Sequence, residues 1–302
     1  MSFTLRQTKK VPRELRRLAR KELRNARGEL ERADPPAPEA IHEARKSLKK
    51  ARAIAQIVDD DHGRGLDGCE KRLRKTGRRL SRVRDADAML EITTKFRRRE
   101  PRLFDVRTSA RLRAWLTKRR DAVLAEATHA DTWTDVEDGL RKLRRKARRW
   151  RPSHRAFGSL ARGIAASHRR GRKALARAMK KGRADDFHAW RKEVKRLWYD
   201  LRLLAPAGAT VRRDVAALHH AEECLGDDHN VVVLCAALSK DGALHGTPLT
   251  VAALQHAADR YHADARKKAL AAVRHIYSVK PKQYVRSLTR AWRDWQRRAT
   301  RR

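Results

Sequence analysis

The chain has 302 residues, and its 76 Lys and Arg side chains stand against 36 Asp and Glu, which gives a formal net charge of +40. The longest apolar run, residues 231–238, is too short to cross a bilayer, and the three cysteines lack a CxxC spacing, so a membrane span, a disulfide framework and a thiolate zinc site are disfavoured. Like charges about 7 Å apart repel by roughly 0.6 kcal/mol even in water, so we expect a phosphate-bearing polyanion, or secondarily an anionic membrane surface, as the partner.

Nearly every long segment has the apolar spacing of an α-helix, and clean strand alternation is scarce, which predicts an all-α fold. Turn-forming residues separate the predicted helices, in chain order, at 34–38, 62–65, 99–101, 151–152, 185–186, 206–208, 246–248 and 280–281. The helices between them are expected to run for roughly 15 to 30 residues, as in helical bundles. The N-terminal segment lacks the apolar core of a signal peptide, so we expect a cytoplasmic protein.

A dense basic pattern follows the first break. Residues 41–54 read IHEARKSLKKARAI, in which H-x-x-R-K-x-x-K-[KR] recurs at helical spacing. At about 100° per residue these positions share one helix face; they are His42, Arg45, Lys46, Lys49 and Lys50, and Arg52 extends the face. The opposite face is apolar, so the segment predicts a helix with one packed and one cationic side. His42 is expected in or near the first turn, where exposed N–H groups favour phosphate.

The same pattern returns in the second half of the chain. Residues 187–200 read FHAWRKEVKRLWYD, and a shift of 146 positions aligns the basic face with His188, Arg191, Lys192, Lys195 and Arg196. A second pair matches at a shift of 145: LSRVRDADAML at 80–90 and LGDDHNVVVLC at 225–235. Two matches at nearly one shift predict a duplication. We therefore expect a single domain over 1–302 made of repeats at about 1–150 and 153–302.

A basic helix face is often only solvated surface, and that interpretation has to be weighed against binding. Solvated faces usually interleave Glu and Lys four residues apart for mutual support. The two repeated faces are nearly free of acidic residues, and the pattern occurs twice. Both observations favour an anion-binding surface.

These motifs resemble the CHAD domain, a family named for its conserved histidines in an α-helical domain. The resemblance covers essentially the whole chain, as a stand-alone member, and it rests on 41–58, 80–87, 187–204 and 225–230. It implies two related four-helix bundles with pseudo-two-fold symmetry around a central basic groove that binds inorganic polyphosphate. The groove would use the basic residues of both repeated helices and others on neighbouring helices, with Arg74, Arg78, Arg82, and Arg169 or Arg172 as candidates. Residues 227–229 read Asp-Asp-His where the first copy has Arg-Val-Arg, which predicts a less positive groove on that side.

Other signals are weaker. The group His219, His220, Glu222, Glu223, Asp227, Asp228 and His229 has metal-like spacing, but helical surfaces often place such residues together. The tryptophans fall on apolar stripes, and only Tyr199 is expected toward the cationic face. We therefore predict no catalytic residue, no metal and no cofactor, and a polyphosphate-binding protein that associates with polyphosphate granules. A general nucleic-acid binder is the alternative, and an accessory subunit of polyphosphate or triphosphate metabolism is a third. The oligomeric state is left open.

Overall fold

A computed structural model describes residues 3–7, 10–32, 36–62, 69–129, 132–149, 156–240, 247 and 249–300. These residues form eleven α-helices and one short 3-10 helix, and no β-strand occurs among them, which confirms the predicted all-α class. The first half contains α1 (Val11–Leu30), α2 (Pro38–His62), α3 (Cys69–Arg79), α4 (Ser81–Arg99), α5 (Val106–His129) and α6 (Thr132–Arg149). The second half contains α7 (Ala156–Lys181), α8 (Ala184–Arg202), η1 (Ala205–Ala207), α9 (Ala209–Lys240), α10 (Val251–Tyr277) and α11 (Pro281–Thr300).

Most helix ends coincide with the break signals in the sequence. Proline occupies the first position of α2 and α11, where its fixed φ suits a helix start and its missing N–H costs nothing. Thr250 caps α10 by accepting a hydrogen bond from the Ala253 N–H at 3.1 Å. The break predicted at 185–186 lies instead just before α8, because Gly182 takes a positive φ of 69° after the end of α7.

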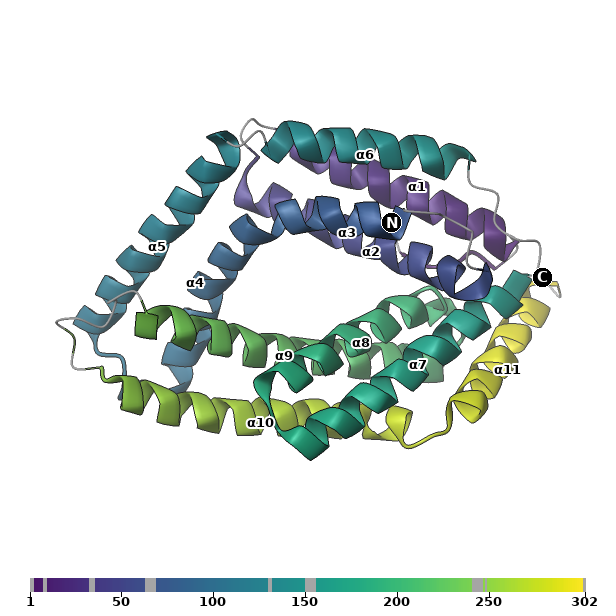
Figure 1. Ribbon diagram of the computed structural model, residues 1–302. Coiled ribbons are helices and arrows are strands. Elements are labelled where there is room, and N and C mark those ends of the chain that lie inside the picture. Colours follow the sequence, from purple (N-terminus) through teal and green to yellow (C-terminus); the bar gives the residue numbers. More distant parts are fainter. Residues whose placement is uncertain are drawn as a thin grey trace.

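The helices form two opposed layers that are joined at both ends (Figure 1). α1, α2, α3 and α6 lie in one layer, and α8, α9 and α10 lie in the other. α4 and α5 connect the layers at one end, while α7 and α11 lie at the other end. The two helices that carry the repeated basic motif, α2 and α8, therefore belong to opposite layers, and they contact each other.

Two hydrophobic cores hold this arrangement, and each combines helices from both halves of the chain. The larger core contains Leu48 of α2 and Trp190 of α8, which are 2% and 0% exposed. The smaller core joins α4 and α5 to α9 and α10, and the rings of Phe96 and Tyr261 meet there edge to face at 5.7 Å. The division at about residue 150 into two separate four-helix bundles stays a prediction. Both hydrophobic cores contain residues from either side of that boundary.

The N-terminal residues also connect the halves. The Leu5 N–H donates to the Leu203 carbonyl at 3.0 Å, just after α8. The ring of Phe3 packs edge to face on Tyr199, with ring centroids 6.3 Å apart. The Gln7 carbonyl accepts from the Gln296 side chain at 2.6 Å on α11. These contacts attach the start of the chain to the second half.

Candidate anion-binding site

The apolar backs of α2 and α8 determine where their basic faces point. Ile41, Ala44 and Leu48 of α2 are at most 2% exposed, and Trp190 and Val194 of α8 are fully buried. Because a helix presents its two faces in opposite directions, anchoring the apolar stripe fixes the orientation of the basic one. In both helices the motif histidine is the fifth residue, one position past the first turn. The first turn of α8 carries Asp185 and Asp186, which disfavours phosphate at that helix end.

Four basic side chains from the two motif copies converge, and we name them the cationic cluster: Arg45 and Lys49 from α2, and Arg191 and Lys195 from α8. The pKa of Lys49 lies well below its ordinary value, because burial disfavours the charged form and because Lys195, Arg45 and Arg191 repel it. Burial and repulsion from Arg191 and Arg45 also lower the pKa of Lys195, although Glu222 opposes the shift. Two helices 146 positions apart in sequence thus bring like charges together.

Each motif histidine contacts a residue from the second matching segment. The Arg84 Nε donates to Nδ1 of His42 at 2.8 Å, and the ring of His229 lies over the ring of His188 with centroids 3.7 Å apart. Arg84 and His229 are related by the shift of 145. Because Nδ1 of His42 accepts a hydrogen bond, its other ring nitrogen carries the proton and can donate to an anion.

Burial and neighbouring positive charges disfavour the protonated form of both motif histidines. The pKa of His188 is lowered to about 4, first by burial and then by repulsion from His229, Lys192 and Arg191. The pKa of His42 is also lowered, by burial and by Arg84. An anion at the cluster would reverse this repulsion and favour protonation of the rings.

The acids at the cluster are unevenly distributed. Glu222 of α9 is buried, accepts a hydrogen bond from Arg191 at 3.1 Å, and forms an ion pair with Lys195. Although burial opposes ionisation, Lys195 and Arg191 hold the pKa of Glu222 below its ordinary value. Arg45 instead donates to the backbone carbonyl of Gly77 at 3.3 Å, and its nearest carboxylate is the exposed Asp85 at 4.0 Å.

Hydrogen-bonding groups in the cluster and beside it are not all satisfied by the surrounding protein. Within the described part of the chain, two buried atoms of the cluster, Arg45 Nε and Arg191 Nε, lack a hydrogen-bond partner, as do Arg84 Nη1 and His188 Nδ1 at the motif histidines. Buried polar groups are usually paired. The three guanidinium nitrogens among these atoms are donors without an acceptor, which is what an anion-binding site requires.

Several other predicted site residues are engaged in ion pairs outside the cluster. Their partners are acidic residues on the same or neighbouring helices: Lys46 with Glu43 at 2.7 Å, Lys50 with Glu22 at 3.3 Å, Arg52 with Glu70 at 2.6 Å, and Arg82 with Glu126 at 2.7 Å. The Lys50–Glu22 pair is the most enclosed, since Glu22 is buried. A ligand would have to compete with these carboxylates for Lys46, Lys50, Arg52 and Arg82.

The remaining predicted residues differ in exposure. Lys192 is exposed, and its charge contributes to the lowered pKa of His188. Arg196 is half-buried on the same helix. Arg74 and Arg78 are exposed on α3. Arg169 is exposed on α7, and Arg172 lies close enough to the buried His168 to lower its pKa. The structure thus brings Arg172 to His168.

Sequence reasoning missed Arg84, His229 and Glu222 as neighbours of the motif helices. The matching shift of 145 was a signal for the first two, because it relates their positions. Glu222 was visible only as a member of the metal-like group. That group is dispersed around α9: Asp227 pairs with Lys95 at 2.8 Å, and Asp228 pairs with Arg266 at 2.9 Å. Among the described residues, no three His, Cys, Asp or Glu side chains are placed to hold a metal ion.

Two aromatic residues of α8 lie in the core. Trp190 is fully buried, and Tyr199, which the sequence directed toward the cationic face, is 5% exposed. The phenol of Tyr199 is therefore enclosed next to Glu222, whose charge together with burial raises its pKa. A side chain enclosed in this way offers no face for stacking on a nucleic-acid base.

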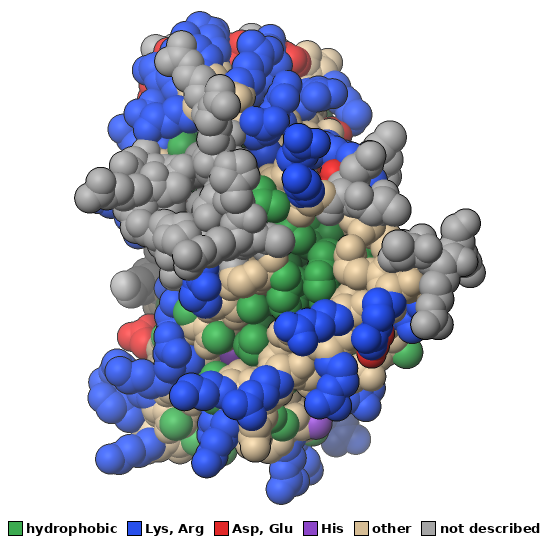
Figure 2. All heavy atoms as spheres, turned by 90° about the vertical axis from the view of Figure 1, so that its right-hand side faces the viewer, with side chains coloured by type: hydrophobic (Ala, Val, Ile, Leu, Met, Phe, Trp, Pro, Cys, Tyr) green, Lys and Arg blue, Asp and Glu red, His purple; other side chains and the backbone are tan. Residues whose placement is uncertain are grey.

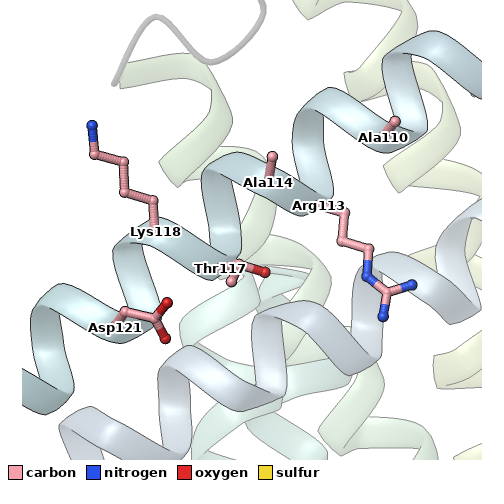
Figure 3. A pocket seen from close by; sticks show the side chains of 6 residues that line it. All are labelled: Ala110, Arg113, Ala114, Thr117, Lys118 and Asp121. Carbon is pink, nitrogen blue, oxygen red and sulfur yellow. The ribbon is translucent and has the colours of Figure 1, made fainter.

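Outside the cluster, the surface is broadly basic. Figure 2 shows Lys and Arg side chains over much of one face, with few acidic side chains between them. A separate hollow of about 590 Å³ runs along α5, where Ala110, Ala114 and Thr117 line it together with Arg113, Lys118 and Asp121 (Figure 3). None of the predicted site residues is among these six. Within the described chain, every helix is too short or too polar to span a membrane.

Comparison with known proteins identifies the family and supports the fold. The sequence model of the CHAD domain matches residues 15–239. The fold is similar to the crystal structure of the CHAD domain from the plant Ricinus communis, with a TM-score of 0.63 and 20% identity over 96% of this chain and 95% of that one. It is also similar to PptA from Streptomyces chartreusis, with a TM-score of 0.59 and 18% identity over 91% of this chain and 100% of that one. Among curated proteins, none matches the chain. Since the family match spans more than half of the sequence, this protein belongs to the CHAD domain family.

Proposed function

We propose that this protein binds inorganic polyphosphate through the cationic cluster and the two motif histidines. The observation that carries the proposal is the convergence of Lys49 and Lys195, from two copies of one motif, although burial and repulsion from Arg45 and Arg191 lower the pKa of both lysines. Partly buried cations that repel one another cost several kcal/mol unless they are paired. A linear chain of phosphates would supply the missing negative charge.

The chemistry around the cluster favours a ligand made of phosphates alone. Arginine guanidinium groups bind phosphate oxygens through paired hydrogen bonds, and lysines act as point charges beside them. Trp190 and Tyr199 of α8 are buried, so nucleic-acid bases would find no stacking surface on these two rings. Trp198 of the same helix is partly buried, and its ring already stacks on His219 with centroids 4.6 Å apart. Polyphosphate has no bases to place.

A competition titration tests the choice of ligand. Labelled long-chain polyphosphate is bound to the protein, and double-stranded DNA or RNA is added at equal phosphate concentration. We expect nucleic acid to displace little of the label. Displacement by nucleic acid as efficient as by unlabelled polyphosphate would instead support the general nucleic-acid binder that the net charge of +40 alone suggests.

A matched pair of variants tests the site. Charge reversal of Arg45 and Arg191 to Glu should weaken binding far more than reversal of Arg286 and Arg290, which are exposed on α11. Both double variants change the net charge by the same amount, so diffuse attraction falls equally in the two. Equal losses of affinity would show that the site is not the cluster.

We further propose that the protein binds polyphosphate without hydrolysing it and associates with polyphosphate granules through this binding. The only buried carboxylate that contacts the cluster among the described residues, Glu222, is engaged by Arg191 and Lys195 and is thus not open to a catalytic cation. Incubation with polyphosphate and Mg²⁺, followed by measurement of released phosphate, tests this part. Release above the buffer control would favour a role in polyphosphate or triphosphate turnover.

A further inference from the structure

The two halves of the cationic cluster differ in one position that the duplication makes comparable. Arg191 bonds the carboxylate of Glu222, and Arg45 bonds the backbone carbonyl of Gly77. Arg45 and Arg191 are related by the shift of 146, and Gly77 and Glu222 by the shift of 145. Of these two corresponding arginines, Arg191 in the second copy contacts a negative charge, and Arg45 in the first copy contacts a neutral carbonyl dipole.

Glu222 occupies the place that a ligand phosphate would take on the second-copy cations. Its side chain is 9% exposed and contacts both Arg191 and Lys195. Glu222 also stabilises the charged form of Lys49 in the first half of the chain, because its negative charge raises the pKa of that lysine. A buried carboxylate that is shared by two cations interacts with them far more strongly than an exposed one.

The first copy has an acid of its own, but a weaker one. Asp85 lies 4.0 Å from Arg45, at the limit of an ion pair, and its side chain is 68% exposed. Exposed pairs of this kind contribute little. The second copy carries the neutral Asn230 at the position related to Asp85 by the shift of 145, so each copy has one acid, and only the acid of the second copy is buried against the cations.

We propose that Glu222 is a built-in counter-anion, which neutralises the second-copy half of the cluster and makes Arg45 and Lys49 of the first copy the primary contact for the polyanion. A phosphate that approaches Arg191 and Lys195 has to displace this carboxylate or share the cations with it. Pairing with Glu222 stabilises the free protein, because its buried cations are not left unpaired. The affinity for the polymer is lower than that of a cluster without Glu222. This inference rests on the proposed function and adds the residue that limits its affinity.

Reciprocal substitutions test the proposal. Glu222→Gln removes the charge and keeps the shape, and it should tighten polyphosphate binding by about tenfold, since a like charge beside a ligand anion costs on this order. Gly77→Glu adds a carboxylate to the first copy, and a Cβ at Gly77 meets no atom within 4 Å. We expect this variant to bind about tenfold more weakly than Gly77→Gln, which adds the same bulk without the charge.

The adjacent Glu223 provides the matched control, because its side chain is 57% exposed and pairs with His219. Glu223→Gln changes the net charge as Glu222→Gln does and should leave the affinity within about twofold. Binding of the wild-type protein is measured first, so absence of that binding would overturn the proposed function itself. With wild-type binding established, an unchanged or weaker affinity of Glu222→Gln would overturn the counter-anion. Equal affinities of Gly77→Glu and Gly77→Gln would do the same, independently of how Glu222→Gln folds.

Discussion

The salt dependence of binding gives the most direct measure of how many cations touch the ligand. The cluster has four cations, Arg84 and Lys192 adjoin the motif histidines, and Glu222 cancels one charge, which leaves a net of five. With about 0.7 counterions released per neutralised phosphate, as for single strands, the logarithm of the affinity should fall with a slope of about −3.5 against the logarithm of salt concentration. Between about 50 and 200 mM salt, the affinity should then fall roughly 130-fold.

Removal of two cluster cations should change this slope by a calculable amount. Lys49→Ala combined with Lys195→Ala leaves a net of three cations, so the slope should become about −2.1 and the same salt increase should cost only roughly 18-fold. Fluorescence anisotropy of end-labelled polyphosphate, titrated at several salt concentrations, measures both slopes. The control is Arg286→Ala with Arg290→Ala, which removes the same charge from the exposed face of α11 and should keep the slope near −3.5. Equal slopes for the two double variants would refute the reasoning, because the ligand would then sense only the overall charge.

Further predictions concern pH, stability and packing. The pKa of His188 is lowered from 6.5 to about 4, so between these pH values the unfolded chain binds a proton that the folded chain does not. The free energy of unfolding should therefore decrease as pH falls from about 6.5 to about 4, and polyphosphate should offset the loss. Chemical denaturation at several pH values, with and without polymer, measures both effects. Lys49→Met should raise the unfolding free energy by about 1 kcal/mol and weaken polyphosphate binding, since it removes a repelled, half-buried charge. Gly171→Ala should lower stability by about 1–3 kcal/mol because its Cβ would lie 2.5 Å from the hydroxyl of the buried Tyr277, whereas Gly28→Ala, with open space around it, should raise stability by up to about 1 kcal/mol; thermal unfolding distinguishes the two.

The helices could be predicted from the sequence because their boundaries depend on local chemistry. Proline at 38 and 281 marks two starts correctly. The separation of α3 from α4 at Leu80 was missed, since 77–81 contains no proline and α9 continues without interruption through the matching segment. The boundary between α5 and α6 also has no proline or glycine to signal it, and residues 130–131 lie outside the described residues.

The composition of the site was less predictable, because it depends on tertiary contacts. Helical spacing alone gave Arg45, Lys49, Arg191 and Lys195. The same spacing also gave Lys50, which the fold directs to Glu22 of α1. Glu222 and Glu223 are adjacent in sequence, but about 100° of helical rotation separates them, so one is buried against the cations and the other is exposed. Which of the two would face α8 follows from the packing of α9, and the pattern along the chain does not contain it.

The sharing of both cores between the halves has a consequence for how the protein opens. Leu48 of α2 and Trp190 of α8 belong to one core, so detachment of either motif helix would open the core that both halves share. Amide hydrogens in the middle of these two helices should therefore exchange with solvent deuterium at one common rate, set by global unfolding. The polyanion would then meet a rigid surface, and its capture would require side-chain rearrangement only.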